Sequence, residues 1–163
     1  MPRPPMPSLI TDCESAVDYR RKFHEMYFGK VITDIMGRSV SIGTDAFDHF
    51  CYKEPDGGKP SIANRTVWQE ERAKRMGWIS LAIEHPWKIL VERDEQNNKQ
   101  KHKSSRKQDY IYISEYEGKN PDVVERFAVV VKKTSNGFLF ITAYMPDYYR
   151  IKKWYSTCTK EYP

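Results

Sequence analysis

The stretch FAVVVKKTSNGFLFITAY, residues 127–144, holds two apolar runs on either side of a turn signal. Phe127–Val131 is fully apolar, as expected of a strand buried in the centre of a sheet. Gly137–Tyr144 is a second apolar run, and Asn136-Gly137 between the two is the strongest short hairpin signal in a sequence. These residues therefore predict two neighbouring antiparallel strands in a core sheet.

Further strands are predicted on the N-terminal side of this hairpin. Trp87–Glu92 has the length and apolar content of a strand, and Tyr110–Tyr116 alternates Tyr with Ile as a half-buried strand does. Ser39–Ile42 alternates polar and apolar residues and predicts a short additional strand. Together with the hairpin, the first two strands predict an antiparallel four-stranded sheet.

Two helices are predicted ahead of the sheet. Thr11 and Glu14 have capping-box spacing, and the apolar residues after them recur at helical spacing, so we expect a helix over about 12–28. Thr66 and Gln69 repeat this spacing before a second helix over about 67–84, which Pro86 terminates. The fold class is therefore α+β, with N-terminal helices packed on an antiparallel four-stranded sheet.

A chain of 163 residues suits one domain with a single core. Residues 1–10 contain four prolines and are expected to form an extended arm. Residues 11–147 are expected to form a single α+β domain, and residues 148–163 a C-terminal tail.

The compartment is expected to be cytoplasmic. The three cysteines are an odd number without CxxC spacing, which does not suit a disulfide framework or a zinc site. No apolar run approaches the roughly 18 residues that a membrane-spanning helix needs. The proline-rich start lacks the apolar segment of a secretory signal.

The charge balance favours an anionic partner. The formal net charge is +5 and the isoelectric point is near 9.0, and excess positive charge attracts polyanions. The positive side chains concentrate in residues 93–107, a polar stretch between two predicted strands that is expected to be a loop. This loop is either a solvated insertion or a contact surface for nucleic-acid backbone, and the cations that would make that contact are Arg93, Lys99, Lys101, Lys103, Arg106 and Lys107.

The motifs that the sequence lacks narrow the possible chemistry. It contains no GxxxxGK or GxGxxG phosphate loop, no HExxH metal motif and no GxSxG nucleophile elbow. We therefore expect no metal and no cofactor. Cleavage of RNA suits such a chain, because the 2′-hydroxyl of RNA is the nucleophile and the protein supplies only an acid, a base and cations.

Histidine exchanges a proton near neutral pH and is the first candidate for the acid or the base. His49 is predicted between a short strand and a Pro/Gly-rich loop, where functional residues are often presented, with its ring outside the core. A lone histidine is also commonly structural, so both roles remain open.

A resemblance to a known family adds to this interpretation. It is carried, in chain order, by the sequences Asp48-His49-Phe50, Glu71-Arg72-Ala73-Lys74-Arg75, Glu84-His85-Pro86, Phe127-Ala128-Val129-Val130-Val131-Lys132 and Phe140-Ile141-Thr142-Ala143-Tyr144. Their order and spacing over about residues 42–144 resemble the phage-associated branch of the barnase–EndoU–colicin–RelE nuclease superfamily. The resemblance implies catalytic roles for the polar residues His49, Arg72 and Thr142, with Lys132 and Tyr144 nearby.

The function expected from these observations is a metal-independent endoribonuclease that leaves 2′,3′-cyclic phosphate ends, as a toxin or as an effector of a phage or mobile element. RNA is the expected partner, together with an inhibitor (antitoxin or immunity) protein if the enzyme is a cellular toxin, and no membrane. Two alternatives use the same sequence features: a non-catalytic RNA- or DNA-binding protein, and a structural protein of a phage or mobile element.

Overall fold

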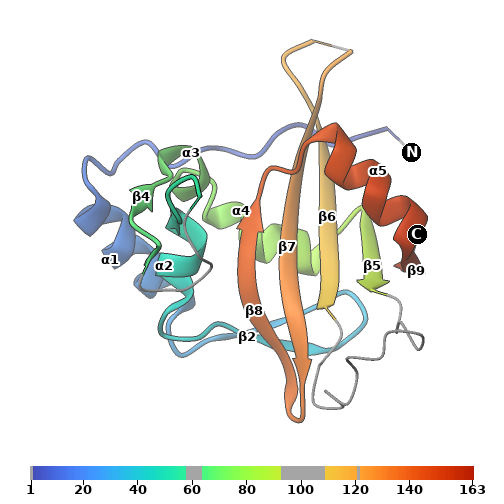
Figure 1. The fold of residues 1–163 in the computed structure, drawn as a ribbon, viewed down its shortest axis with the longest axis horizontal. Helices are drawn as coiled ribbons and strands as arrows, with labels where there is room; N and C mark the ends of the chain where they lie inside the picture. Colours follow the sequence, from blue (N-terminus) through green and yellow to red (C-terminus); the bar gives the residue numbers. More distant parts are fainter. Residues whose placement is uncertain (1, 58–63, 93–108, 121) are drawn as a thin grey trace.

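The computed structural model describes residues 2–57, 64–92, 109–120 and 122–163, and Figure 1 shows how these residues are arranged. The helices in these ranges are α1 (Ala16–Tyr27), α2 (Ala46–Cys51), α3 (Glu70–Ala73), α4 (Gly77–Glu84) and α5 (Tyr148–Thr157). The strands are β1 (Val31–Thr33), β2 (Ser39–Ser41), β3 (Tyr52–Lys53), β4 (Val67–Trp68), β5 (Lys88–Glu92), β6 (Asp109–Glu117), β7 (Val124–Thr134), β8 (Gly137–Tyr144) and β9 (Cys158–Tyr162).

The predicted hairpin forms the middle of the main sheet. Strands β7 and β8 pair antiparallel, with Thr134 opposite Gly137 at the turn. Gly137 has a φ of +134°, and a Cβ there would lie 2.9 Å from the Ser39 carbonyl oxygen of β2. Glycine is therefore required where the hairpin meets β2, which explains the turn signal physically.

The expected four-stranded antiparallel sheet is wrong in the number of strands and in their direction. In the described part of the chain the main sheet has seven strands in the order β1-β2-β8-β7-β6-β5-β9, and β2 runs parallel to β8. The four expected strands, β5 to β8, are the antiparallel centre. Of the three additional strands, β2 forms where a short strand was predicted over Ser39–Ile42. The other two, β1 and β9, are edge strands whose sequences show little of the apolar alternation on which strand prediction depends.

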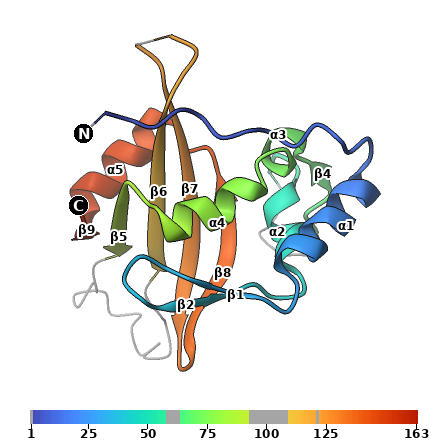
Figure 2. The same ribbon diagram turned by 180° about the vertical axis from the view of Figure 1, so that it is seen from behind.

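The two faces of the sheet are covered by different helices. Figure 2, the view from behind, shows α4 crossing in front of the central strands, where Trp78 and Ile79 lie with Phe127 and Val129 in the larger core. On the opposite face, α5 packs through Ile151 and Trp154 against a smaller core that contains Ile111, Ile113 and Ala128. The sheet is therefore the middle layer of the domain where α5 covers it.

Both predicted helices begin later than their capping-box signals indicated. The first begins at Ala16, where Ser15 caps it by accepting a hydrogen bond from the Asp18 amide over 3.4 Å. Residues before it are held elsewhere, since the Ile10 amide donates to the Lys74 carbonyl over 2.8 Å.

The second predicted helix, 67–84, is divided into three elements. Val67–Trp68 forms β4 and pairs with β3, and the rest forms α3 and α4. Trp68 lies with its ring centroid 5.3 Å from that of Tyr52 and 5.6 Å from that of Tyr19. Packing of this indole among aromatic rings outweighs the local preference for helix.

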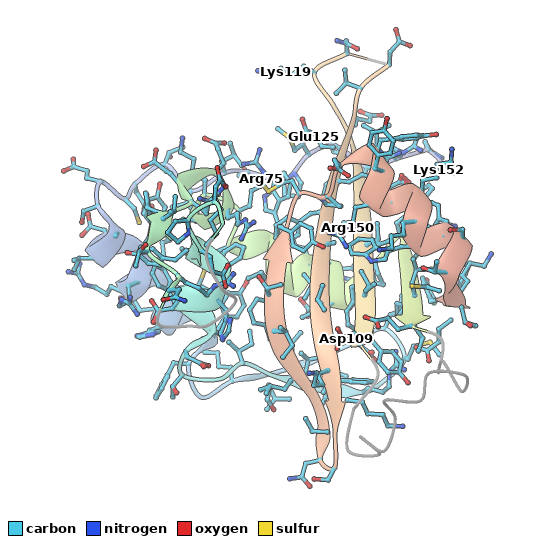
Figure 3. The ribbon with its side chains drawn as sticks, in the orientation of Figure 1. Arg75, Asp109, Lys119, Glu125, Arg150 and Lys152 are labelled. Carbon is cyan, nitrogen blue, oxygen red and sulfur yellow. The ribbon has the colours of Figure 1, made fainter. Side chains whose placement is uncertain are left out.

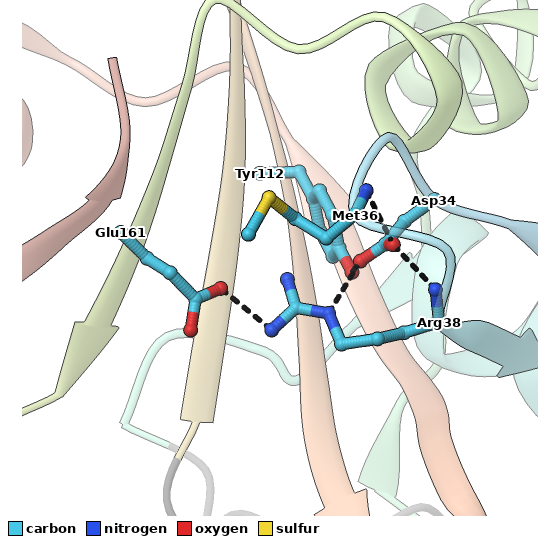
Figure 4. A network of polar contacts seen from close by, with 5 residues as sticks. All are labelled: Asp34, Met36, Arg38, Tyr112 and Glu161. Atoms are coloured by element: carbon cyan, nitrogen blue, oxygen red, sulfur yellow. Dashed lines mark hydrogen bonds and ion pairs between the residues drawn. The ribbon is translucent and has the colours of Figure 1, made fainter.

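A buried carboxylate fastens the loop between β1 and β2 to the sheet (Figure 4). Asp34 accepts hydrogen bonds from Tyr112 Oη at 2.6 Å and from Arg38 Nε at 2.8 Å. Arg38 also lies 2.6 Å from Glu161 of β9. The network joins the two edges of the sheet and stabilises the platform on which the site described below is built.

The terminal segments are integrated into the fold. The N-terminal arm has no helix or long strand; Pro5 forms an isolated bridge with Glu117, and the Ser8 carbonyl accepts from Trp78 Nε1 at 3.1 Å. Residues 148–163, expected as a tail, form α5 and β9, and β9 pairs with β5. Among the described residues, no helix has both the length and the apolar character needed to cross a membrane.

Candidate active site

The carbonyl oxygen of His49 is the point at which three segments of the chain meet. His49 lies in the last turn of α2, which corrects the expectation that it follows a strand directly. Thr142 Oγ1 of β8 donates to this carbonyl over 3.1 Å, and Arg65 Nη2 donates over 2.8 Å. The first bond fixes the end of α2 against β8, and the second fixes it to Arg65, which precedes β4. We call this meeting point the corner.

Arg65 holds this corner together, and sequence analysis did not nominate it. Its Nε donates to the Tyr52 carbonyl and its Nη1 to Glu54, both at 3.0 Å, in addition to the bond to His49. A single arginine after a Pro/Gly-rich loop carries no sequence signal of this role. The role depends on the β3–β4 pairing, which was not predicted.

Arg72 brings a second positive charge into the same corner. It projects from α3, and its guanidinium carbon lies 5.7 Å from the ring centre of Tyr144. Burial, and next the positive charge of Arg65, lower the pKa of Arg72. In the part of the chain that the structure describes, its guanidinium forms no ion pair or hydrogen bond, although the negative charge of Glu54 acts on it. The guanidinium is therefore able to bind an anion.

Tyr144 closes the corner at the end of β8. It packs against the smaller core, with its ring centroid 6.2 Å from that of Trp154 of α5. Burial raises the pKa of the Tyr144 phenol, although the positive charges of Arg150 and Arg72 act in the opposite direction. The phenol therefore remains protonated at neutral pH and is able to donate a hydrogen bond or a proton.

The His49 side chain is partly accessible, with 32 % exposed. Its Nε2 lies 3.6 Å from Asp45 Oδ2, one helical turn earlier. The imidazole is therefore presented at the surface next to a carboxylate.

Cys51, in the same helix, is not suited to be a nucleophile. It is fully buried, and burial strongly raises the pKa of its thiol despite the positive charges of Arg72 and Arg20. The thiolate form that nucleophilic chemistry requires is therefore absent near neutral pH.

The other predicted site residues lie elsewhere. Lys132 is exposed on β7 opposite Leu139 and Asp109, toward the hairpin turn, whereas Thr142 lies opposite Val130. The cations Arg93, Lys99, Lys101, Lys103, Arg106 and Lys107 lie outside the described residues. No group of three or more His, Cys, Asp or Glu side chains able to hold a metal ion occurs among the residues that were placed.

The arrangement defines an α+β protein with a partly desolvated cationic site at the end of its antiparallel strands, a site suited to bind a phosphate. The chain belongs to the phage-Barnase-EndoU-ColicinE5/D-RelE like nuclease2 family, whose model matches residues 18–158. The resemblance to this nuclease superfamily is thereby confirmed, and the match extends beyond the 42–144 expected to include α5. Comparisons with curated proteins and with solved structures found no match.

Proposed function

We propose that this protein is a metal-independent endoribonuclease that cleaves RNA by attack of the 2′-hydroxyl on the adjacent phosphate. One observation carries the proposal: the half-buried Arg72 guanidinium lies beside Tyr144 and close to the charge of Arg65, without an ion pair or hydrogen bond among the described residues. The positive charge of Arg72, next to that of Arg65, suits the extra negative charge of a phosphorane.

The proposed chemistry assigns a step to each side chain. His49 takes the proton of the 2′-hydroxyl as the 2′-oxygen forms its bond to phosphorus, and Asp45 stabilises the resulting imidazolium. The bond from phosphorus to the 5′-oxygen breaks, and the Tyr144 phenol gives that oxygen a proton. Arg72 stabilises the phosphorane, and the product is a 2′,3′-cyclic phosphate.

Thr142 has a positioning role in this proposal. Its hydroxyl proton is already given to the His49 carbonyl, so the hydroxyl holds α2 in place. Lys132 and the cations of residues 93–107 are proposed to contact RNA backbone beyond the scissile phosphate, and an inhibitor protein is proposed as a partner if the enzyme acts as a toxin.

The test compares cleavage of an RNA and a DNA of the same sequence in the presence of EDTA. We expect cleavage of the RNA alone, and a decrease of about two to three orders of magnitude in the Arg72→Gln variant, because a preorganised phosphorane contact is removed. Arg21→Gln, at an exposed arginine of α1 paired with Asp18, is the matched control and should cleave normally. Binding of RNA without cleavage would favour the non-catalytic alternative.

A further inference from the structure

The outward side of α5 carries exposed aromatic rings among positive charges. Tyr148 and Tyr149 are 64 % and 81 % exposed, and their ring centroids lie 6.4 Å apart. The helix contains Arg150, Lys152 and Lys153 and no acidic residue. The carboxylate that directly precedes it is the N-cap Asp147, which accepts from the Arg150 amide at 2.8 Å.

This helix is fixed beside the candidate active site. Ile151 and Trp154 anchor it in the smaller core, to which Tyr144 also contributes its ring. Figure 3 shows Arg150 on the flank of α5 that lies over the central strands and Lys152 on the other flank. Tyr148 follows Tyr144 by four residues, so the two Cα atoms lie at most about 14 Å apart, the reach of a few nucleotides.

Exposed aromatic rings next to cations are typical of surfaces that bind single-stranded nucleic acid, because bases stack on the rings while phosphates contact the cations. Protein interfaces also use tyrosine, with fewer charges at their centre. Because α5 has no acidic residue and lies beside the proposed phosphate site at Arg72, we favour single-stranded nucleic acid over a protein partner.

We propose that the first turn of α5 is a stacking subsite for single-stranded nucleic acid: a base next to the scissile phosphate lies on Tyr148 or Tyr149, and the adjoining phosphate contacts Arg150. This assignment rests on the proposed function for the location of the scissile phosphate. Binding itself does not depend on cleavage.

The experiment measures fluorescence anisotropy of a labelled 2′-O-methyl RNA of about eight nucleotides, within the site sizes of single-strand binding folds. This probe lacks the nucleophile and is not cleaved. We expect the Tyr148→Ala/Tyr149→Ala variant to bind roughly 10- to 100-fold more weakly with an unchanged salt dependence. Arg150→Gln should reduce the slope of log affinity against log salt by about 0.7. Tyr149→Phe should bind normally, and Phe28→Ala, which removes a ring that is 62 % exposed at the end of α1, is the matched control.

Unchanged affinity in the double variant would overturn the subsite and leave the two tyrosines as candidates for contact with a protein partner. An equal decrease in affinity for duplex RNA would overturn it as well, since paired bases do not stack on side chains. If unmodified RNA is not cleaved while the tyrosine effect persists, the proposed function fails and the subsite stands. If RNA is cleaved and the variants bind alike, the subsite alone fails.

Discussion

The hydroxyl of Thr142 donates a hydrogen bond to the carbonyl oxygen of His49 over 3.1 Å, across 93 residues of sequence. The bond joins the last strand of the central hairpin to the helix that presents the candidate general base. The side chain of Thr142 and the backbone of His49 thus hold together two polar residues that the family resemblance nominated.

Replacement of Thr142 by valine tests this connection. Valine keeps the shape and the strand preference but removes the donor, so we expect a decrease of about 1 kcal/mol in the free energy of unfolding and a decrease in cleavage activity larger than this destabilisation explains. Urea titrations and initial cleavage rates measure the two effects. Thr142→Ser should retain both properties, and a fully active Thr142→Val protein would show that the bond does not position the site.

Replacement of His49 by alanine tests the proposed base. We expect cleavage to fall by roughly two to four orders of magnitude, the usual range for a positioned acid or base. Stability should change little, because the ring is partly exposed and the carbonyl that binds Thr142 and Arg65 remains. Rates at several pH values, alongside thermal melts, separate the two effects. A folded variant that cleaves at the normal rate would remove His49 from the mechanism.

Asp34 controls stability rather than chemistry. Burial acts to raise the pKa of its carboxyl, but the hydrogen bonds from Tyr112 and Arg38 outweigh burial and hold the pKa below its ordinary value. A lowered pKa in the folded state means that the carboxylate stabilises the fold above about pH 4 and that this contribution disappears as the pH falls below it.

We therefore expect Asp34→Asn to lower the free energy of unfolding by about 3 kcal/mol at pH 7, since it leaves the Arg38 guanidinium without the more deeply buried of its two carboxylate partners. The difference from the unmodified protein should shrink as the pH falls from 5 toward 3. Urea titrations over this range provide the measurement, with the exposed Asp12→Asn as the control. A difference that does not depend on pH would contradict the assigned role.

The basic residues of the 93–107 stretch, which lie outside the described residues, give a separate prediction. Replacing Lys99, Lys101, Lys103, Arg106 and Lys107 by glutamine should weaken RNA binding for all sequences. It should also flatten the dependence of log affinity on log salt by about 0.7 for each phosphate that the protein no longer neutralises. Anisotropy titrations at several salt concentrations measure the slope, and an unchanged slope would identify the stretch as a solvated insertion.

Some features of this fold could be predicted from sequence because their signals are local. Asn136-Gly137 and the apolar runs beside it predicted the central hairpin. In the structure Ser135 and Asn136 form the turn, and Gly137 takes the positive φ where β8 begins. Thr66 and Gln69 gave a capping signal that failed, because Trp68 packs into an aromatic cluster and its segment pairs as a strand. Such packing depends on residues far apart in sequence.

The candidate site also contains residues that were predicted from the sequence and one that was missed. His49, Arg72, Thr142 and Tyr144 were nominated by resemblance. The structure bonds Thr142 to the His49 backbone and places Arg72 beside Tyr144, and Arg65 is bonded to His49 and acts on Arg72 through its charge. Arg65 was missed because its three bonds go to two backbone carbonyls and one carboxylate that only the folded chain brings together. Lys132 was grouped with the site by its place in a motif, but the strand register sets it toward the hairpin turn.

Mass spectrometry of the fragments released from a defined RNA in the presence of EDTA tests the proposed chemistry most directly. Attack by the 2′-hydroxyl predicts fragments that end in a 2′,3′-cyclic phosphate, with a free 5′-hydroxyl on the other fragment, and no cleavage where a single 2′-deoxy nucleotide replaces the attacking one. Fragments with 5′-phosphate ends, or cleavage that stops in EDTA and returns with Mg²⁺, would contradict it.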